Sequence, residues 1–240
     1  MMIKMVKSGI ALIAILMLVA ELQASEKLLI NTGFTPPVST YFDKVLQEAA
    51  KRVNMDIELV EVSAERSLRM VVEGKADAEC CRISKVIKPT YPTLVDVPVS
   101  FYQMNWVAFV KDKNITISQW DDLKKYSAAA VTGYKLAVIK VKEFSPSPQI
   151  LDTHESMFKM LSRNRVDTGI TAKLVGLKVI KDLKLDDTIS LLQPSIFKIP
   201  LTLQLHEKHE DKVTLFSKVF TEINQDGTAD RLLEEVLAEL

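Results

Sequence analysis

The chain has 240 residues, 48% of them hydrophobic, and its 31 Lys and Arg side chains balance 31 Asp and Glu side chains. This length accommodates one or two compact domains with substantial cores. A neutral chain without a basic run lacks the clustered positive charge that binds phosphate backbones, so nucleic acid is excluded as an expected partner.

The first residues have the pattern of an export signal. Lys4 and Lys7 precede the apolar run Gly9 to Ala20, and Leu22-Gln23-Ala24 predicts cleavage after Ala24. The run is shorter than the roughly 20 residues that span a bilayer. We therefore expect residues 1–24 to be a signal peptide that is removed from an exported protein, with an uncleaved anchor as the alternative.

Strand and helix patterns alternate along the next part of the chain. Apolar residues at spacings of three and four predict helices, and short apolar or alternating runs predict strands. The expected strands are 27–32, 57–62 and 76–82, and the expected helices are 39–54 and 64–73. This order predicts an α/β fold, with a parallel sheet and helices packed on its faces.

A second series of the same kind follows a proline-containing loop at 84–99. It comprises strands at 104–111, 127–132, 149–153 and 166–171, and helices from Ser118 and at 133–141, 155–164 and 173–184. Two strand-like runs, 189–193 and 199–205, precede two helices within 211–240. Asp77 and Asp167 each follow a helix and a tight turn, which predicts two similar lobes in which these side chains brace the turns.

The segment Val72 to Ile83 delivers an arginine to the end of a strand. Gly74 suits the left-handed position after a helix, and the strand that follows ends at Arg82. In α/β domains the carboxyl ends of strands face the crevice in which ligands bind, and a guanidinium there can pair with an anion. A surface or interlobe salt bridge is the alternative role for Arg82.

Two adjacent cysteines, Cys80 and Cys81, lie in this strand. Neighbouring strand side chains point to opposite faces, so a bridge between them requires a strained backbone, and the chain has no other cysteine. We expect two free thiols, at least one of them buried, with a vicinal disulfide as the alternative. The three histidines show no ligand spacing with these cysteines, so we expect no metal site and no cofactor.

The order of several motifs resembles the periplasmic solute-binding proteins of the amino-acid type (bacterial extracellular family 3). The motifs are EGKADA at 73–78, DVPVSFYQMNWVAFV at 96–110, SQWDDLKKY at 118–126, AAAVTGYKL at 128–136 and NRVDTGIT at 164–171. The resemblance covers 28–240 and implies a two-lobed clamshell with two crossing hinge strands. Lobe one would comprise 26–104 and 200–240, and lobe two 105–199, with a small-molecule ligand between them.

The resemblance also implies which residues contact the ligand. Phe34 matches an aromatic residue of the first loop, and Thr132 and Gly133 match the lobe-two loop at a helix start, where backbone N–H groups can hold a carboxylate. The other candidates are Arg66, Arg82, Tyr102, Tyr134 and Thr171. Core packing is the alternative for Phe34, hinge packing for Tyr102, and a solvated or structural role for Arg66.

Two departures from the family pattern bear on the ligand. The family usually carries a Thr-x-x-Arg segment that grips a carboxylate, where this chain has VIKPTY at 86–91. It also usually places an acidic residue five positions after the lobe-two strand aspartate, where this chain has Ala172. We therefore do not expect a standard α-amino acid as the ligand, and Arg82 or Arg66 would supply the anion contact.

The expected function is noncatalytic. We expect a monomeric periplasmic protein that captures a small polar, anionic solute for an ABC-type importer or a membrane sensor. One alternative is a small-molecule lyase of the dehydratase kind, in which Glu79 is the acid or base and Arg82 holds the anion, although the same two residues could form a structural ion pair. The other is a structural partner whose cleft has lost its ligand.

Overall fold

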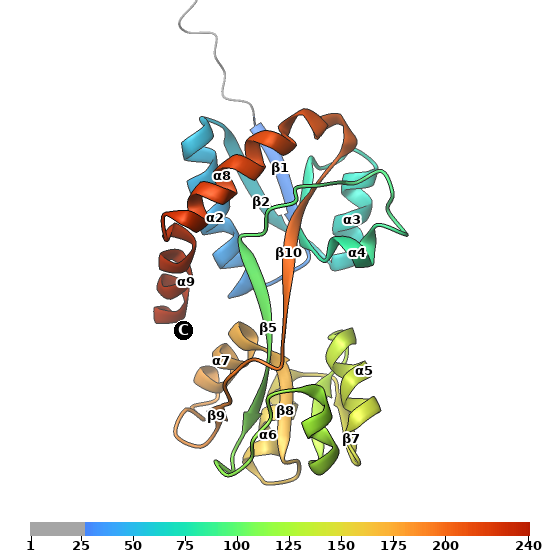
Figure 1. Ribbon diagram of the computed structural model, residues 1–240, viewed down its shortest axis with the longest axis vertical. Helices are drawn as coiled ribbons and strands as arrows, with labels where there is room; N and C mark the ends of the chain where they lie inside the picture. Colours follow the sequence, from blue (N-terminus) through green and yellow to red (C-terminus); the bar gives the residue numbers. More distant parts are fainter. Residues whose placement is uncertain (1–26) are drawn as a thin grey trace, which may run out of the picture.

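The computed structural model describes residues 27–240, so the predicted signal peptide and its cleavage site lie outside the described residues. The chain forms two lobes joined by two long strands, β5 (Tyr102–Val110) and β10 (Phe197–Leu205) (Figure 1). The predicted α/β architecture with two lobes and two crossing strands is confirmed. Within residues 27–240, none of the helices combines the length and the apolar character of a membrane span.

Lobe one is built on the parallel strands β1 (Lys27–Thr32), β2 (Asp56–Glu61) and β3 (Ala78–Arg82), in the order β2-β1-β3. Its helices are α2 (Val38–Val53), α3 (Ala64–Val72), α4 (Ser84–Ile87), α8 (Val213–Gln225) and α9 (Thr228–Ala238). Side chains alternate between the two faces of β1: Ile30 belongs to the apolar core with α2 and α8, whereas Asn31 faces Met70 of α3. The predicted β-α-β-α-β order is therefore confirmed.

Lobe two has a sheet of its own, in the order β5-β8-β6-β7. Its strands are β6 (Ala128–Val131), β7 (Pro148–Leu151), β8 (Thr168–Ala172) and the short β9 (Ser190–Leu191), which pairs with β5. Its helices are α5 (Lys135–Phe144), α6 (His154–Ser162) and α7 (Lys173–Asp182). As in lobe one, parallel strands alternate with helices along the chain.

The two long strands connect the sheets by pairing with each other. β5 and β10 run antiparallel from the pair Phe197–Trp106 to the pair Leu201–Tyr102. Beyond this ladder β10 continues beside β3 of lobe one, and β5 continues beside β8 of lobe two. The predicted lobe boundaries, after residues 104 and 199, fall inside these two strands, and the exact division stays a prediction.

An aspartate braces the corresponding position in each lobe. The Asp77 carboxylate accepts a hydrogen bond of 2.9 Å from the backbone N–H of Leu29, at the start of β1. The Asp167 carboxylate accepts one of 2.8 Å from the N–H of Ser127, just before β6. Each aspartate thus ties the turn before its own strand to the beginning of the neighbouring parallel strand, as the internal repeat predicts.

Asp77 also holds the segment that follows β10. It lies 2.8 Å from Lys208 Nζ and 2.7 Å from His209 Nε2, in the 3-10 helix η2 (Glu207–Lys212). Burial alone raises the pKa of Asp77, but the hydrogen bonds from Lys208, His209 and the Leu29 N–H outweigh it and lower the pKa to about 2. The ionised carboxylate therefore fastens the C-terminal part of the chain to the first sheet.

Two predicted elements differ from the structure. The predicted helix from Ser118 is a 3-10 helix, η1 (Trp120–Lys125), which Gln119 and Asp122 start with a capping box. The predicted loop at 84–99 contains α4 and the short strand β4 (Val95–Asp96), which pairs with β10. These elements are short. Their periodicity is too brief to distinguish a 3-10 helix from an α-helix at η1, or to distinguish α4 and β4 from a loop.

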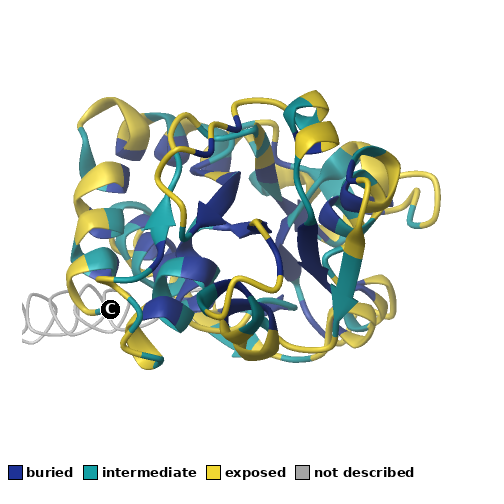
Figure 2. Ribbon diagram, turned by 90° about the horizontal axis from the view of Figure 1, so that it is seen from below, coloured by how far each residue is buried: buried dark blue, intermediate teal, exposed yellow. Residues whose placement is uncertain are grey.

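Burial follows the sheets of both lobes. Buried residues lie along the central strands, and exposed residues lie on the outer faces of the helices (Figure 2). In lobe two, α7 approaches β5 closely because residue 176 is a glycine. A Cβ atom at Gly176 would collide with the ring of the fully buried Phe109 and lie 3.1 Å from Thr171 Cγ2.

We predict that Gly176→Ala destabilises the protein by about 1–3 kcal/mol, because the added methyl group overpacks this contact. Chemical denaturation of the mature protein measures the change. Phe109→Leu in the Gly176→Ala background removes the aromatic edge, so the two substitutions should be less harmful together than the sum of their separate effects. Strict additivity would contradict a clash between these two residues.

Candidate functional site

The strand registers show which sheet ends face the opposite lobe. Arg82, the last residue of β3, pairs with Thr202, and β10 reaches lobe two at its other end, Phe197. Ala172, the last residue of β8, pairs with Trp106 of β5. The carboxyl ends of the parallel strands in both lobes therefore point toward the region that the two long strands cross, where ligands bind in open α/β sheets.

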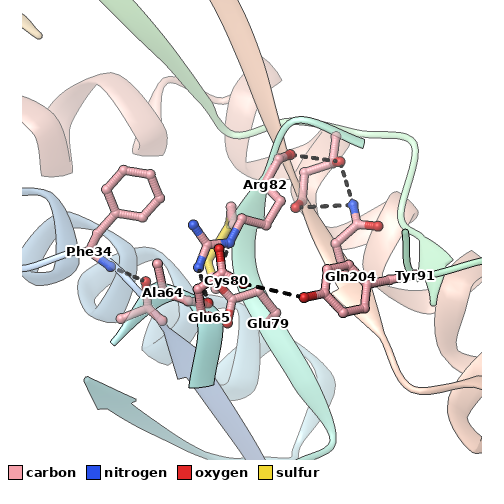
Figure 3. A network of polar contacts seen from close by, with 11 residues as sticks. Phe34, Ala64, Glu65, Glu79, Cys80, Arg82, Tyr91 and Gln204 are labelled. Carbon is pink, nitrogen blue, oxygen red and sulfur yellow. Dashed lines mark hydrogen bonds and ion pairs between the residues drawn. A yellow bond between two sulfur atoms is a disulfide. The ribbon is translucent and has the colours of Figure 1, made fainter. Parts of the chain in front are cut away.

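Arg82 braces three segments at the inter-lobe end of lobe one. Its Nε lies 2.6 Å from Glu79 Oε1 in the same strand, and its Nη2 donates a hydrogen bond of 3.1 Å to the carbonyl of Ala64 at the start of α3. Its guanidinium carbon lies 5.7 Å from the centre of the Phe34 ring, in the loop after β1. Figure 3 shows Phe34, Ala64, Glu79 and Gln204 around the arginine.

The guanidinium fits because the residue beneath it has no side chain. A Cβ atom at Gly33 would collide with Arg82 Nη2 and would lie 2.7 Å from the Ala64 Cα. The Arg82 side chain is 15% exposed, so part of it reaches solvent. A guanidinium has five N–H donors, and the two contacts above leave others for an anion. Both predicted roles of Arg82, in an ion pair and at an anion site, are compatible with this geometry.

The Phe34 ring packs against the core of lobe one. It packs edge-on against Phe42 of α2 at 5.5 Å between ring centres, and Arg82 lies over the ring. The packing role is thus present in the structure, and contact with a solute stays a prediction.

Glu79 lies behind Arg82 and has no exposure to solvent. Burial raises its pKa to about 7, against the lowering effects of the Arg82 charge and the Gly33 backbone N–H. A solute between the lobes would meet Arg82 before it reached Glu79. The predicted structural ion pair is therefore formed, and the carboxylate is not placed to exchange a proton directly with a bound molecule.

The cysteine prediction is wrong. Cys80 and Cys81 form a disulfide with each other, both are fully buried, and no free cysteine is present in the described residues. The peptide bond between them is cis and their Cα atoms lie 3.0 Å apart. The side chains of the bonded pair thus do not follow the alternation expected of a regular strand. The register between β3 and β10 shifts at the same place.

Arg66 is exposed on α3, two residues after Ala64. It lines a shallow surface hollow of about 320 Å³ together with Arg69, Met70, Glu73 and Lys75, and Arg82 is not among the lining residues. Arg82 instead donates to the carbonyl of Ala64 at the beginning of the same helix.

In lobe two, Tyr134 and Thr171 meet through a histidine. His154 Nε2 lies 2.7 Å from Thr171 Oγ1, and Tyr134 packs edge-on against the imidazole at 4.6 Å between ring centres. Tyr134 also lies 6.0 Å from the ring of Trp106 in β5. Burial lowers the pKa of His154 to about 4, so its imidazole is neutral at pH 7. The cluster is uncharged and lies at the end of the lobe-two sheet; its two rings are partly exposed, and the Thr171 hydroxyl is buried beneath them.

Sequence reasoning missed His154 as part of this cluster. The residue begins α6 directly after the N-cap Thr153, whose hydroxyl accepts the Ser156 N–H. A histidine at a predicted helix start after a strand was the available signal, since such positions lie at the same sheet end as the other site residues.

Thr132 and Gly133 are exposed at the end of β6. The Thr132 N–H already donates to the carbonyl of Leu151 at 2.8 Å, and the Tyr134 N–H donates to Val131 at 3.1 Å. Gly133 has a φ of +92°, which favours glycine, and α5 begins two residues later at Lys135. Since first-turn N–H groups have no partner within a helix, the donors left for an anion are those of α5.

Tyr102 is buried at the base of β5. Its ring packs 5.4 Å from both Tyr41 and Phe42 of α2, and burial raises its pKa. The hinge-packing alternative is therefore the role that the contacts show. Among residues 27–240, no group of three or more His, Cys, Asp and Glu side chains could hold a metal ion.

No protein-family model matches this sequence, and no curated protein matches it either. Solved structures match the fold. A putative binding component of an ABC transporter from Wolinella succinogenes, complexed with lysine, is 16% identical with a TM-score of 0.67, covering 87% of this chain and 94% of that chain. The GluR0 ligand-binding core with L-glutamate is 10% identical with a TM-score of 0.70, covering 89% and 99%.

A histidine kinase sensor domain with similarity to periplasmic binding proteins is 12% identical with a TM-score of 0.64, covering 89% of this chain and 96% of that chain. At such identities the likeness concerns the fold alone. The chain therefore has the two-lobed type II periplasmic-binding-protein fold.

Two buried groups give the stability of the protein opposite pH dependences. Folded Glu79 keeps a proton up to about pH 7 that the unfolded chain loses near 4.5, so its contribution to the free energy of unfolding falls as pH rises through this window. The unfolded chain protonates His154 below 6.5, whereas the folded protein does so only near 4, so this contribution rises with pH.

We predict that the two effects oppose each other between about pH 4.5 and 6.5. Relative to the wild type, Glu79→Gln should make the free energy of unfolding rise more steeply with pH, and His154→Gln should make it rise less steeply. Each change in slope is at most about 1.4 kcal/mol per pH unit, the value for one proton. Urea denaturation across this range measures the slopes, and parallel profiles for all three proteins would contradict the assignment.

Proposed function

We propose that this chain is an exported member of the extracellular solute-binding proteins of family 3, which holds a small polar, anionic solute between its two lobes. The carrying observation is Arg82, a cation fixed at the inter-lobe end of lobe one by Glu79, Ala64 and Phe34. Because a pre-positioned guanidinium loses little freedom on binding, this geometry favours recognition of a carboxylate or another planar anion.

The facing surface of lobe two supports the same reading. It offers the start of α5 at Lys135, where free N–H groups and the helix dipole favour negative charge. Beside it stand the rings of Tyr134 and the neutral His154. A solute that touched Arg82 from one lobe and α5 from the other would favour the closed arrangement of the lobes, since only that arrangement supplies both contacts.

The solute we propose is not a standard α-amino acid. The solved relatives named above hold lysine and L-glutamate. In this chain, the position at which the family carries a carboxylate for the ligand's amino group is Ala172, which is 1% exposed. We infer that an organic anion without an α-ammonium group, such as a dicarboxylate or an aromatic acid, fits better.

Delivery to an ABC-type importer is the first proposed role, and reporting to a membrane sensor is the second. The second is supported by the likeness to a histidine kinase sensor domain of the same fold. A lyase activity is less favoured, because its candidate acid, Glu79, is completely buried behind Arg82. Of the remaining predicted contacts, we propose that Phe34, Gly133 and Tyr134 line the site with Arg82 and that Thr132 lies at its margin. Tyr102 and Thr171 are buried, and Arg66 lines another hollow, so we assign these three no direct contact with the solute.

A thermal-shift screen of the mature protein against amino acids, dicarboxylates, polyamines and aromatic acids tests the proposal. A solute at about 100 times its dissociation constant should add about 2.7 kcal/mol to the free energy of unfolding. We expect a hit among the organic anions, recovered unchanged after incubation. Consumption of the hit would show an enzyme, and silence across the set would favour a structural partner.

Arg82→Ala should abolish the stabilisation by that anion, because it removes the fixed cation. Arg69→Ala is the matched control: it removes an exposed arginine of α3 that lines a hollow without Arg82, and it should leave the affinity unchanged. Far-UV circular dichroism checks that both variants are folded. Equal affinity in Arg82→Ala and the wild type would exclude Arg82 as the anion contact.

A further inference from the structure

A row of buried polar side chains crosses the sheet of lobe one. Asn31 of β1 and Gln204 of β10 both pair with Glu79 of β3, which lies between them. Paired residues project to the same face of a sheet, so the three side chains lie side by side. Their exposures are 0%, 1% and 0% for Asn31, Gln204 and Glu79. Such a row is unusual in a core, because buried polar groups need partners.

The row has acceptor oxygens without donors. Asn31 Oδ1 and Gln204 Oε1 have no hydrogen-bond partner within residues 27–240. An ionised carboxylate adds further acceptors to such a group, whereas a protonated carboxyl adds one O–H donor. The composition of the row therefore suits a Glu79 that carries a proton.

The charges around Glu79 come from few elements. Arg82 of β3 is the cation paired with it, and the loop after β1 contributes only the backbone N–H of Gly33. From β10, Gln204 faces it, and its amide is already bound to Asp96 of β4. In α3, the carboxylate of Glu65 lies 3.5 Å from the hydroxyl of Tyr91. Arg82 is thus the charged group whose pairing changes most directly when Glu79 ionises.

We propose that Glu79 is a positioning residue that sets the charge Arg82 offers to a solute, so that an anion at Arg82 and a proton at Glu79 bind together. When Glu79 is ionised, it holds the guanidinium and neutralises it. When Glu79 takes up a proton, the positive charge of Arg82 becomes available to an anion between the lobes. This inference rests on the proposed function, which places the anion at Arg82.

The coupling has a defined direction. A buried Glu79 with a pKa of about 7 exchanges its proton near neutral pH. Linkage requires that an anion which favours the protonated form also raises the pKa of Glu79. Above that pKa the affinity for the anion should fall by up to about tenfold for each pH unit, and below it the affinity should level off. A purely structural ion pair would show no such dependence.

Nuclear magnetic resonance tests the inference without an identified solute. In mature protein labelled with carbon-13 at glutamate and nitrogen-15 at arginine, the Glu79 carboxyl carbon and the Arg82 Nε–H should titrate with one common midpoint near 7. Glu79→Gln assigns the first signal. Replacing chloride by sulfate at equal ionic strength should move the midpoint upward, because sulfate serves as the anion probe. The Arg82 signal should move with it.

Two results would overturn the proposal. A Glu79 midpoint near its ordinary value would show that the pair stays ionised throughout the neutral range. A midpoint that is identical in sulfate and chloride would show that anions do not couple to the proton. As a variant control, Arg69→Gln should keep the sulfate effect and Arg82→Gln should abolish it; if Arg82→Gln does not fold, the wild-type titration alone decides.

This experiment separates the inference from the proposed function. The titration requires no natural solute, so it can fail while the thermal-shift screen yields an anion that binds equally well at every pH. Conversely, the screen can yield no hit while the Glu79 midpoint still shifts between chloride and sulfate.

Discussion

One buried charge pair organises the inter-lobe end of the first lobe. A carboxylate without solvent is stable only beside a cation or with a proton, and Glu79 has Arg82 at 2.6 Å. Holding Arg82 in this position also fixes what the guanidinium touches, namely the start of α3 and the aromatic ring after β1. Gly33 has no side chain and so leaves the space that the guanidinium occupies. The inter-lobe end of lobe one therefore takes its shape from an interaction within its core.

Lobe two presents a different chemistry at the equivalent sheet end. Its Tyr134, His154 and Thr171 are neutral and hold one another by ring packing and a hydrogen bond. One lobe thus carries a fixed cation and the other carries an uncharged surface with a helix start. A solute between them would obtain charge recognition from one side and shape recognition from the other.

Much of this arrangement could be predicted from the sequence. Periodicity gave the order of helices and strands, and the repeated helix, turn and aspartate indicated two similar lobes; Gly74 and Asn164 even share the left-handed backbone conformation three residues before the two aspartates. Other features depend on distances that no local pattern encodes. The Cys80–Cys81 disulfide departs from the side-chain alternation of a regular strand, and the contact of His154 with Thr171 required the alignment of α6 with β8.

The chain path has a consequence for the order in which the lobes can form. Lobe two is made from one continuous segment, whereas lobe one needs β10 beside β3, the clasp between Asp77 and His209, and the contact of Tyr41 with Ala229, which are 188 residues apart. Contacts between distant residues form late, because the loop between them must close first. We expect lobe two to fold early, and we expect lobe one to complete its fold only when the last helices of the chain have docked.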